Sequence, residues 1–158
     1  MQTFLPYPSF VASAECLDNK RLGKQRVECL QILQTLQKKK ENPNAKIAWA
    51  NHPIVKMWEG YEVRLVSYGK IICLEWVSRG FKDTCFAKIR EFDIIHTNDI
   101  YYALPPFVGD EQFHLSHQSN LLRKDFNHYS KYFNVPDNLP YKWYNPKAGE
   151  FYEIHGAK

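Results

Sequence analysis

Cysteine is scarce in this chain, and the few cysteines present lack the spacing of a metal site. The 158 residues contain four cysteines, none of them in a C-x-x-C pair: Cys16, Cys29, Cys73 and Cys85. Free cysteines within apolar helical patterns behave as small hydrophobic residues. The sequence therefore predicts neither a disulfide framework nor a structural zinc site, and we expect no cofactor.

Signals for secretion, for membrane insertion and for several common kinds of chemistry are also missing. The first ten residues, MQTFLPYPSF, lack the basic region and apolar stretch of a signal peptide, and no apolar run is long enough to span a membrane. The chain contains no P-loop, no dinucleotide-binding fingerprint, no H-E-x-x-H and no G-x-S-x-G motif. We expect an intracellular protein (cytoplasm or nucleoid, or a virus-infected cell) with no membrane contact and no obligate protein partner.

The composition is notable for its aromatic residues and for a mild excess of cations. Ten Tyr, ten Phe and four Trp make up 15% of the residues, more than a small core needs, so we expect some rings to face a partner. The formal net charge of +4 says little by itself, because many proteins that bind no nucleic acid carry as much. Local clusters of charge are therefore more informative than the sum.

The first part of the chain is predicted to be an arm followed by a helix. Residues 1–10 contain two prolines and indicate an extended N-terminal arm. Apolar residues at three- and four-residue spacing then predict a helix over 11–40. Gly23 interrupts this pattern, which favours a kink or a close approach by a ligand backbone there.

The remaining pattern is also mainly helical. A helical region over 53–78 begins at a proline and is divided near a glycine, and 110–125 is a further helix. Residues 136–158 form an irregular aromatic tail. The sequence therefore predicts an all-α fold, a compact single domain over 1–158 of about three main helices with long connections.

The strongest local feature is the basic segment within the sequence LDNKRLGKQRVE. Four cations lie within seven residues: Lys20, Arg21, Lys24 and Arg26. Lys20 and Lys24 are one helical turn apart, and like charges on one face repel unless an anion such as a phosphate compensates. Arginine can hold a phosphate through two hydrogen bonds at once. The alternative is an ordinary solvated helix face, because basic helix turns are common.

A second polar segment, HLSHQSNLLRK, starts at His114 on a helix that must also pack. His114 and His117, three residues apart, could ligate a metal, but no third ligand at suitable spacing is nearby, so we expect no metal site. Histidines that form internal hydrogen bonds, or contacts to nucleic acid, are the alternatives. His117 and Lys124 are seven residues apart and fall on one face.

The aromatic tail has two interpretations. Its rings alternate with cations: Trp143, Tyr144, Phe151 and Tyr152 lie near Lys142 and Lys147. Rings interleaved with cations can stack on exposed bases. The alternative is a tail that packs its rings across open helix faces.

Six segments carry a family resemblance: MQTFLPYP, LDNKRLGKQRVECLQIL, NHPIVKMW, EWVSRGFKDTC, PPFVGDEQFHLSHQSNLLRKD and LPYKW. In this order they resemble the pyrimidine-dimer DNA glycosylase (endonuclease V) family, and more closely a bacterial and viral branch of it. The resemblance spans most of the chain. It implies an all-α single domain and a DNA-repair hydrolase, a glycosylase with or without AP-lyase activity, whose partner is damaged or modified double-stranded DNA.

The resemblance also implies a mechanism. In the characterised enzymes the N-terminal α-amine attacks the sugar C1′ of the damaged nucleotide, a carboxylate of the first helix assists, and the imine undergoes β-elimination. An α-amine has a reference pKa of about 7.7 to 8.0, so a useful fraction is neutral near pH 7. The bulk of Gln2 opposes methionine removal, which assigns the amine to Met1. Lys20 or Lys24 is the alternative nucleophile.

The assisting carboxylate and the DNA contacts follow from the same resemblance. The family's glutamate falls within a stretch that reads RLGKQR here and holds no carboxylate; Asp18 lies about one turn earlier and Glu28 just beyond. We predict Asp18, because its helix face can point back toward the arm. The predicted DNA-binding residues are Lys20, Arg21, Lys24, Gln25, Arg26, His117, Gln118, Asn120, Arg123 and Lys124.

Two rival functions are compatible with these residues. The first is a non-catalytic DNA-binding or packaging protein on the same fold, which the missing glutamate favours. The second is a glycosidase that acts on a nucleotide outside duplex DNA, or an RNA-directed variant, which the mild charge allows.

Overall fold

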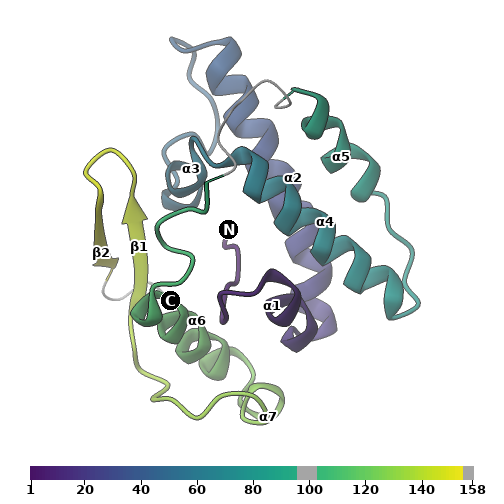
Figure 1. The fold of residues 1–158 in the computed structure, drawn as a ribbon, viewed down its shortest axis with the longest axis vertical. Helices are drawn as coiled ribbons and strands as arrows, with labels where there is room; N and C mark the ends of the chain where they lie inside the picture. Colours follow the sequence, from purple (N-terminus) through teal and green to yellow (C-terminus); the bar gives the residue numbers. More distant parts are fainter. Residues whose placement is uncertain (96–102, 155–158) are drawn as a thin grey trace. The chain divides into compact units, whose positions relative to one another are not determined.

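The structure is a computed structural model that describes residues 1–95 and 103–154 (Figure 1). The chain divides into two compact units, each built from two separate stretches of sequence. Unit 1 comprises Met1–Thr3 and Asn19–Pro105, and unit 2 comprises Phe4–Asp18 and Pro106–Lys158. The single domain over the whole chain stays a prediction.

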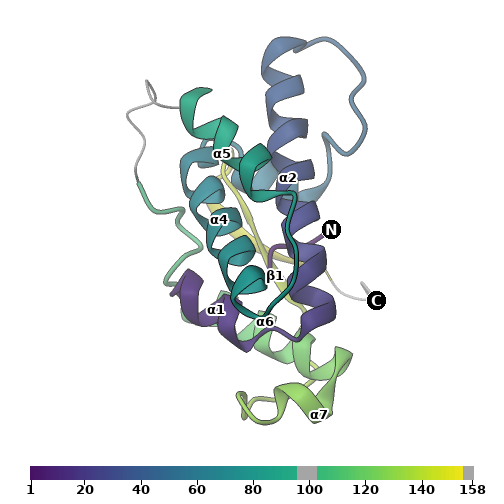
Figure 2. The same cartoon turned by 90° about the vertical axis from the view of Figure 1, so that its right-hand side faces the viewer.

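Unit 1 is built around long helices. They are α2 (Asn19–Glu41), α3 (Pro53–Trp58), α4 (Glu62–Ser78) and α5 (Phe86–Ile95). α2 packs along α4, and α4 packs along α5, as the two views in Figures 1 and 2 show. Their apolar faces meet in a core whose fully buried members include Leu22, Ile32, Leu65 and Ile72. This core fixes the face of α2 on which the candidate site lies.

Two glycines permit the close packing of these helices. A Cβ at Gly69 of α4 would lie 2.5 Å from the Cys29 sulfur and 3.1 Å from the Ile89 side chain. A Cβ at Gly23 of α2 would lie 2.9 Å from the Trp76 ring. Gly23, where the sequence suggests a kink or an approaching ligand, is therefore the contact point for a tryptophan of the neighbouring helix.

Gly69→Ala is expected to destabilise the protein by about 1 to 3 kcal/mol, because the added methyl group overpacks a buried contact. At an unconstrained helix position the same change would stabilise by up to about 1 kcal/mol. Urea unfolding measures the difference. The double variant Gly69→Ala/Cys29→Ala, which removes the clashing sulfur, should recover part of the loss. A single variant as stable as the wild type would contradict this packing.

Unit 2 combines helices with a hairpin. Its elements are α1 (Phe10–Cys16), α6 (Glu111–Lys124), α7 (Phe126–Tyr129), β1 (Tyr141–Asn145) and β2 (Glu150–Ile154). α6 packs against β1 and against α7 (Figure 1). Asp110 caps α6, since its side chain accepts a hydrogen bond of 2.8 Å from the Phe113 backbone N–H. Phe107, Phe113 and Tyr129 are fully buried and supply the aromatic core of this unit.

The predicted helical class is confirmed, but the fold is not strictly all-α. Seven helices occur within the described residues, together with one two-stranded antiparallel sheet. The sheet lies in the tail that the sequence presents as irregular, and pairs Tyr141 with Ile154 at one end and Asn145 with Glu150 at the other. Aromatic residues favour such a half-buried pleated surface. Residues 155–158 of the predicted tail lie outside the described residues.

The helix boundaries also differ from the predicted ones. The pattern over 11–40 is divided into α1 and α2, because Leu17 has extended dihedral angles of −69° and 138°. α5, with mixed apolar spacing, is an additional helix. Among the helices in the described parts of the chain, none is both long and apolar enough to cross a membrane.

Candidate active site

The first three residues of the chain are held in unit 1 by buried side chains. The Gln2 backbone N–H donates to Glu28 Oε2 at 3.4 Å. The Gln25 side-chain amide donates to the Gln2 carbonyl oxygen at 2.7 Å. Trp58 Nε1 donates to Thr3 Oγ1 at 3.0 Å. The N-terminal segment is thus fixed against α2 and α3, with its α-amine one residue before the contact to Glu28.

Glu28 is a buried carboxylate with several donors around it. It is 8% exposed and accepts a hydrogen bond of 2.9 Å from Gln25 Nε2 in addition to the one from the Gln2 backbone. Lys24, whose side chain is 73% exposed, places its ammonium 3.8 Å from Glu28 Oε1. Burying a carboxylate costs free energy unless it is hydrogen-bonded or paired. Glu28 therefore links the buried N-terminal backbone to a solvent-exposed cation.

The positive charge of the N-terminal amine also affects the pKa of His52. This residue precedes α3, and its Nδ1 accepts a hydrogen bond of 3.1 Å from the Ile54 backbone N–H. The pKa of His52 is lowered, first by burial of the ring and second by the charge of the N-terminal amine. His52 is therefore a further titratable neighbour of the amine, which the sequence did not single out.

Gln2 itself contributes an unusual side chain. Its Oε1 accepts a hydrogen bond of 3.0 Å from the Thr3 backbone N–H, which fixes the orientation of the amide. Its buried Nε2 has no hydrogen-bond partner within the described residues. A buried donor without a partner costs about 1 to 3 kcal/mol. The segment that carries the α-amine is thus held at an energetic cost.

The basic segment Lys20 to Arg26 is only partly a surface feature. Lys20 and Lys24 are exposed, and Arg21 is half-buried. The Arg26 guanidinium forms an ion pair of 2.5 Å with Asp83 and lies 4.5 Å from the centre of the Trp76 ring. Arg26 therefore ties α2 to the C-terminal end of α4 and to the loop before α5.

Asp83, the partner of Arg26, is itself held by several hydrogen bonds. Burial opposes ionisation of Asp83, but hydrogen bonds from Arg26 and from the Phe86 and Cys85 backbone N–H groups outweigh it, so its pKa is lowered. Its carboxylate caps α5 through the bond to the Phe86 N–H at 2.8 Å. The side chain of Arg26, predicted to bind DNA, is thus engaged inside unit 1 in this conformation.

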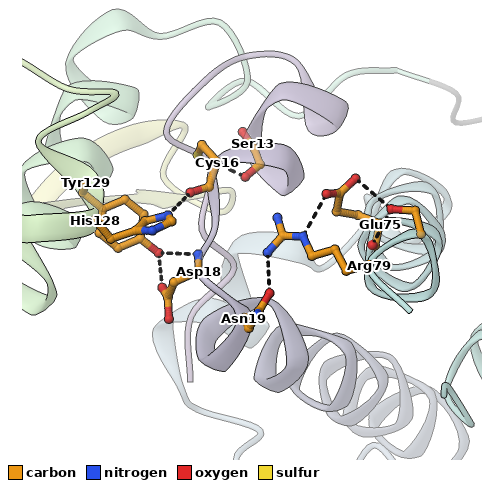
Figure 3. A network of polar contacts seen from close by, with 9 residues as sticks. Ser13, Cys16, Asp18, Asn19, Glu75, Arg79, His128 and Tyr129 are labelled. Carbon is orange, nitrogen blue, oxygen red and sulfur yellow. Dashed lines mark hydrogen bonds and ion pairs between the residues drawn. The ribbon is translucent and has the colours of Figure 1, made fainter. Parts of the chain in front are cut away.

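Asp18, the predicted assisting carboxylate, belongs to unit 2. Its carboxylate accepts a hydrogen bond from the Tyr129 hydroxyl, which in turn accepts one of 3.1 Å from the Asp18 backbone N–H (Figure 3). Beside them, His128 Nε2 donates to the Cys16 carbonyl oxygen at 2.8 Å. These bonds connect the end of α1 to α7, which is a structural use of Asp18.

Asn19, the next residue, starts α2 and makes a separate contact inside unit 1. Its side-chain oxygen accepts a hydrogen bond of 3.0 Å from Arg79 Nη1 (Figure 3). Arg79 also forms an ion pair of 2.9 Å with Glu75. The N-terminal end of α2 is thereby fastened to the C-terminal end of α4.

The two histidines of α6 hold the N-terminal arm within unit 2. His117 Nδ1 accepts a hydrogen bond of 3.0 Å from the Leu5 backbone N–H. His114 Nε2 accepts one of 2.9 Å from the Gly109 N–H, so its Nδ1 carries the proton and donates to the Leu5 carbonyl oxygen at 2.7 Å. Gln118 Nε2 donates to the Pro6 carbonyl oxygen at 2.8 Å. Both backbone groups of Leu5 are thus satisfied by a histidine pair.

Burial keeps this pair neutral. The pKa of His117 is lowered to about 3, first by its complete burial and second by the nearby His114. The pKa of His114 is lowered for the same main reason. Within the described parts of the chain, no cluster of three or more His, Cys, Asp or Glu side chains could hold a metal ion. Internal hydrogen bonding is therefore the use that the structure gives to both rings.

The rest of the predicted α6 contacts divide between the interior and the surface. Asn120 is 4% exposed, and its amide donates to the Ser116 carbonyl oxygen at 2.7 Å. Arg123 donates to the Asp137 carbonyl oxygen at 2.6 Å and also bonds Asn120, which secures the chain before β1. Lys124, at the end of α6, has an exposed side chain.

The structure thus brings Gln2, Lys24, Gln25 and Glu28 together in unit 1, which also contains Met1, while Asp18 and the α6 residues lie in unit 2. A model of the pyrimidine dimer DNA glycosylase family matches residues 1–89. The chain belongs to the pyrimidine dimer DNA glycosylase family. The matched stretch contains the N-terminus, Asp18 and the whole of α2, and ends before α6. No curated protein and no solved structure matches the chain.

Proposed function

We propose that this chain is a DNA glycosylase with AP-lyase activity that removes a damaged or modified pyrimidine from double-stranded DNA. The observation that carries the proposal is the 3.4 Å contact between the Gln2 backbone N–H and Glu28, which brings the start of the chain beside a buried carboxylate. An α-amine next to a carboxylate is the pair that imine chemistry at a sugar needs. Membership in the pyrimidine dimer DNA glycosylase family supports the same substrate class.

In the proposed reaction the neutral Met1 amine attacks C1′ and the C1′–N bond of the base breaks. One proton of the amine is passed to the departing base, and the other to the ring oxygen O4′ as the sugar ring opens to an imine. Loss of the C2′ proton then expels the 3′ phosphate by β-elimination. Glu28 is proposed to stabilise the cationic sugar and to shuttle these protons. Water then hydrolyses the imine and frees the amine, and the proposed chemistry requires no cofactor.

Glu28 is preferred to Asp18 for this role on geometric grounds. Glu28 accepts a hydrogen bond from the residue that follows Met1, whereas the Asp18 carboxylate accepts one from Tyr129 in unit 2. Each carboxylate sits on a family-matched segment, so the family match does not separate them. The contact of Glu28 to the N-terminal backbone separates the two candidates.

The proposed DNA contacts are three exposed lysines. Lys20 and Lys24 in unit 1, and Lys124 in unit 2, present solvent-exposed ammonium groups. Phosphates neutralised by such groups release counterions, so the affinity should fall as salt rises. We assign structural roles to six other predicted contacts, whose side chains hold the fold through hydrogen bonds or ion pairs: Gln25, Arg26, His117, Gln118, Asn120 and Arg123. Arg21, which is half-buried, stays a predicted DNA contact. The base must leave the stack for the amine to reach C1′.

Borohydride reduction during incubation with DNA that carries an abasic site is expected to trap a covalent adduct on Met1. Mass spectrometry of the digested adduct should find the DNA remnant on the N-terminal peptide. An extension of two residues before Met1 displaces the amine and should abolish trapping while DNA binding persists.

Two other results would redirect the assignment. An adduct on Lys20 or Lys24 would make a side-chain amine the nucleophile. Salt-dependent DNA binding with neither trapping nor base release from ultraviolet-treated DNA would instead favour a non-catalytic DNA-binding protein.

A further inference from the structure

A buried hydrogen-bond chain leads from α4 to the candidate active site. The Tyr68 hydroxyl donates to Gln25 Oε1 at 2.8 Å. Gln25 Nε2 then donates to two acceptors, the Gln2 carbonyl oxygen at 2.7 Å and Glu28 Oε2 at 2.9 Å. Tyr68 is 0% exposed and Gln25 is 1% exposed, so water does not compete for these bonds. The sequence placed Gln25 among the DNA contacts, and its burial requires another use.

Two acceptors determine which way the Gln25 amide faces. The Gln2 carbonyl oxygen and the Glu28 carboxylate can only accept, so the amide nitrogen meets them and the amide oxygen is left to accept from the Tyr68 hydroxyl. In the flipped orientation, Gln25 Oε1 would face the carboxylate and the Gln2 carbonyl oxygen, and three acceptors would meet without a proton. Tyr68 therefore satisfies the amide oxygen in the one orientation in which Gln25 attracts both groups.

We propose that Gln25 and Tyr68 are positioning residues that set the separation between the Met1 amine and the Glu28 carboxylate. One amide nitrogen holds the backbone next to the amine and the carboxylate at the same time, so the two groups move together. This inference rests on the proposed function, because it assigns these groups to the amine and carboxylate chemistry. Neither residue needs to touch the substrate.

The expected consequence is a loss of rate and not of binding. A misplacement of reacting groups by about 1 Å can cost on the order of a hundredfold in rate. Tyr68 and Gln25 are buried, so their substitution leaves the exposed lysines unchanged. The affinity for DNA should therefore stay close to that of the wild type.

The test uses two near-isosteric variants, Tyr68→Phe and Gln25→Met, in the full-length protein. Thr35→Val is the matched control, since Thr35 is 7% exposed on the same helix and its hydroxyl only bonds the Gln31 carbonyl oxygen at 2.7 Å. Three quantities are measured for each protein: the single-turnover rate of base release, the Kd for the same lesion-bearing duplex, and the melting temperature. Tyr68→Phe and Gln25→Met should lose about ten- to a hundredfold in rate with an unchanged Kd, and Thr35→Val should lose only thermal stability.

A fourth readout does not depend on DNA. The Met1 α-amine is labelled with formaldehyde and borohydride, and the labelled N-terminal peptide is quantified over time. Slower labelling in Tyr68→Phe and Gln25→Met than in Thr35→Val supports the positioning role. Equal labelling rates, or wild-type single-turnover rates in both variants, would overturn it. A wild-type protein that releases no base would refute the proposed function alone, and the labelling rates would still decide the positioning role.

Discussion

Glu28→Gln is expected to reduce base release by about a hundredfold or more while leaving the affinity for DNA nearly unchanged. Proton transfer by a positioned carboxylate contributes on the order of 10² to 10⁴ in rate. The amide of the variant can still accept hydrogen bonds from Gln25 and from the Gln2 backbone through its oxygen. Single-turnover kinetics with saturating protein, together with a Kd from fluorescence anisotropy, separate chemistry from binding.

Asp18→Asn is the matched control, because it makes the same change at the carboxylate that the sequence favours. Asparagine keeps an acceptor for the Tyr129 hydroxyl, so unit 2 should retain its fold. We expect turnover within about threefold of the wild type, since general acid–base contributions are confined to groups within reach of the reacting atoms. The reverse pattern, in which Asp18→Asn loses turnover and Glu28→Gln keeps it, would return the catalytic role to Asp18.

The proposal of Glu28 in place of Asp18 shows what the sequence could and could not supply. Helical spacing predicted that residues three or four apart share a face, and Lys24, Gln25 and Glu28 do cluster on α2. The family match likewise directs attention to this helix. What local spacing cannot reveal is that Gln2 contacts Glu28, 26 residues away. One feature of the sequence did point to Glu28: it lies four residues after Lys24, at the spacing of an ion pair on one helix face.

The histidines of α6 illustrate the same limit. Their spacing left metal binding, nucleic-acid contact and internal hydrogen bonding open, because all three use the same ring nitrogens. The deciding partner of His117 is Leu5, 112 residues earlier in the chain. The apolar pattern over 110–125 predicted α6 itself, and the structure adds that Asp110 caps it. The role of its polar face depended on a tertiary contact.

The tail was misjudged for a different reason. Residues 136–158 were predicted to be irregular because no helical or alternating pattern was recognised there. Gly149 instead adopts a φ of 68°, as the turn between β1 and β2 requires, and the rings on both sides fall on paired strands. Tyr144 and Phe151 face each other across the hairpin, with ring centres 5.1 Å apart. The packing of β1 against α6 then stabilises a sheet in a segment whose local sequence did not predict one.

Acidification is expected to destabilise the protein through the buried histidine pair. His117 has a pKa of about 3 in the folded chain against an ordinary value of 6.5. Between these values the unfolded chain binds a proton that the folded chain does not, so the free energy of unfolding falls as the pH falls below 6.5. Above pH 6.5 both states are neutral at this residue and the effect vanishes. Linkage gives a loss of about 2 to 3 kcal/mol at pH 4.5, to which His114 adds in the same direction.

His117→Asn tests this origin, because asparagine can offer an acceptor to the Leu5 N–H without titrating. Urea unfolding at pH 7 and at pH 4.5 should show a smaller difference for His117→Asn than for the wild type, even if the variant is less stable at both. Gln118→Leu removes another contact to the arm, the bond to Pro6, and introduces no change in titration. It should lower stability by a similar amount at both pH values. A wild-type pH dependence in His117→Asn would mean that acid destabilises the protein through groups other than His117.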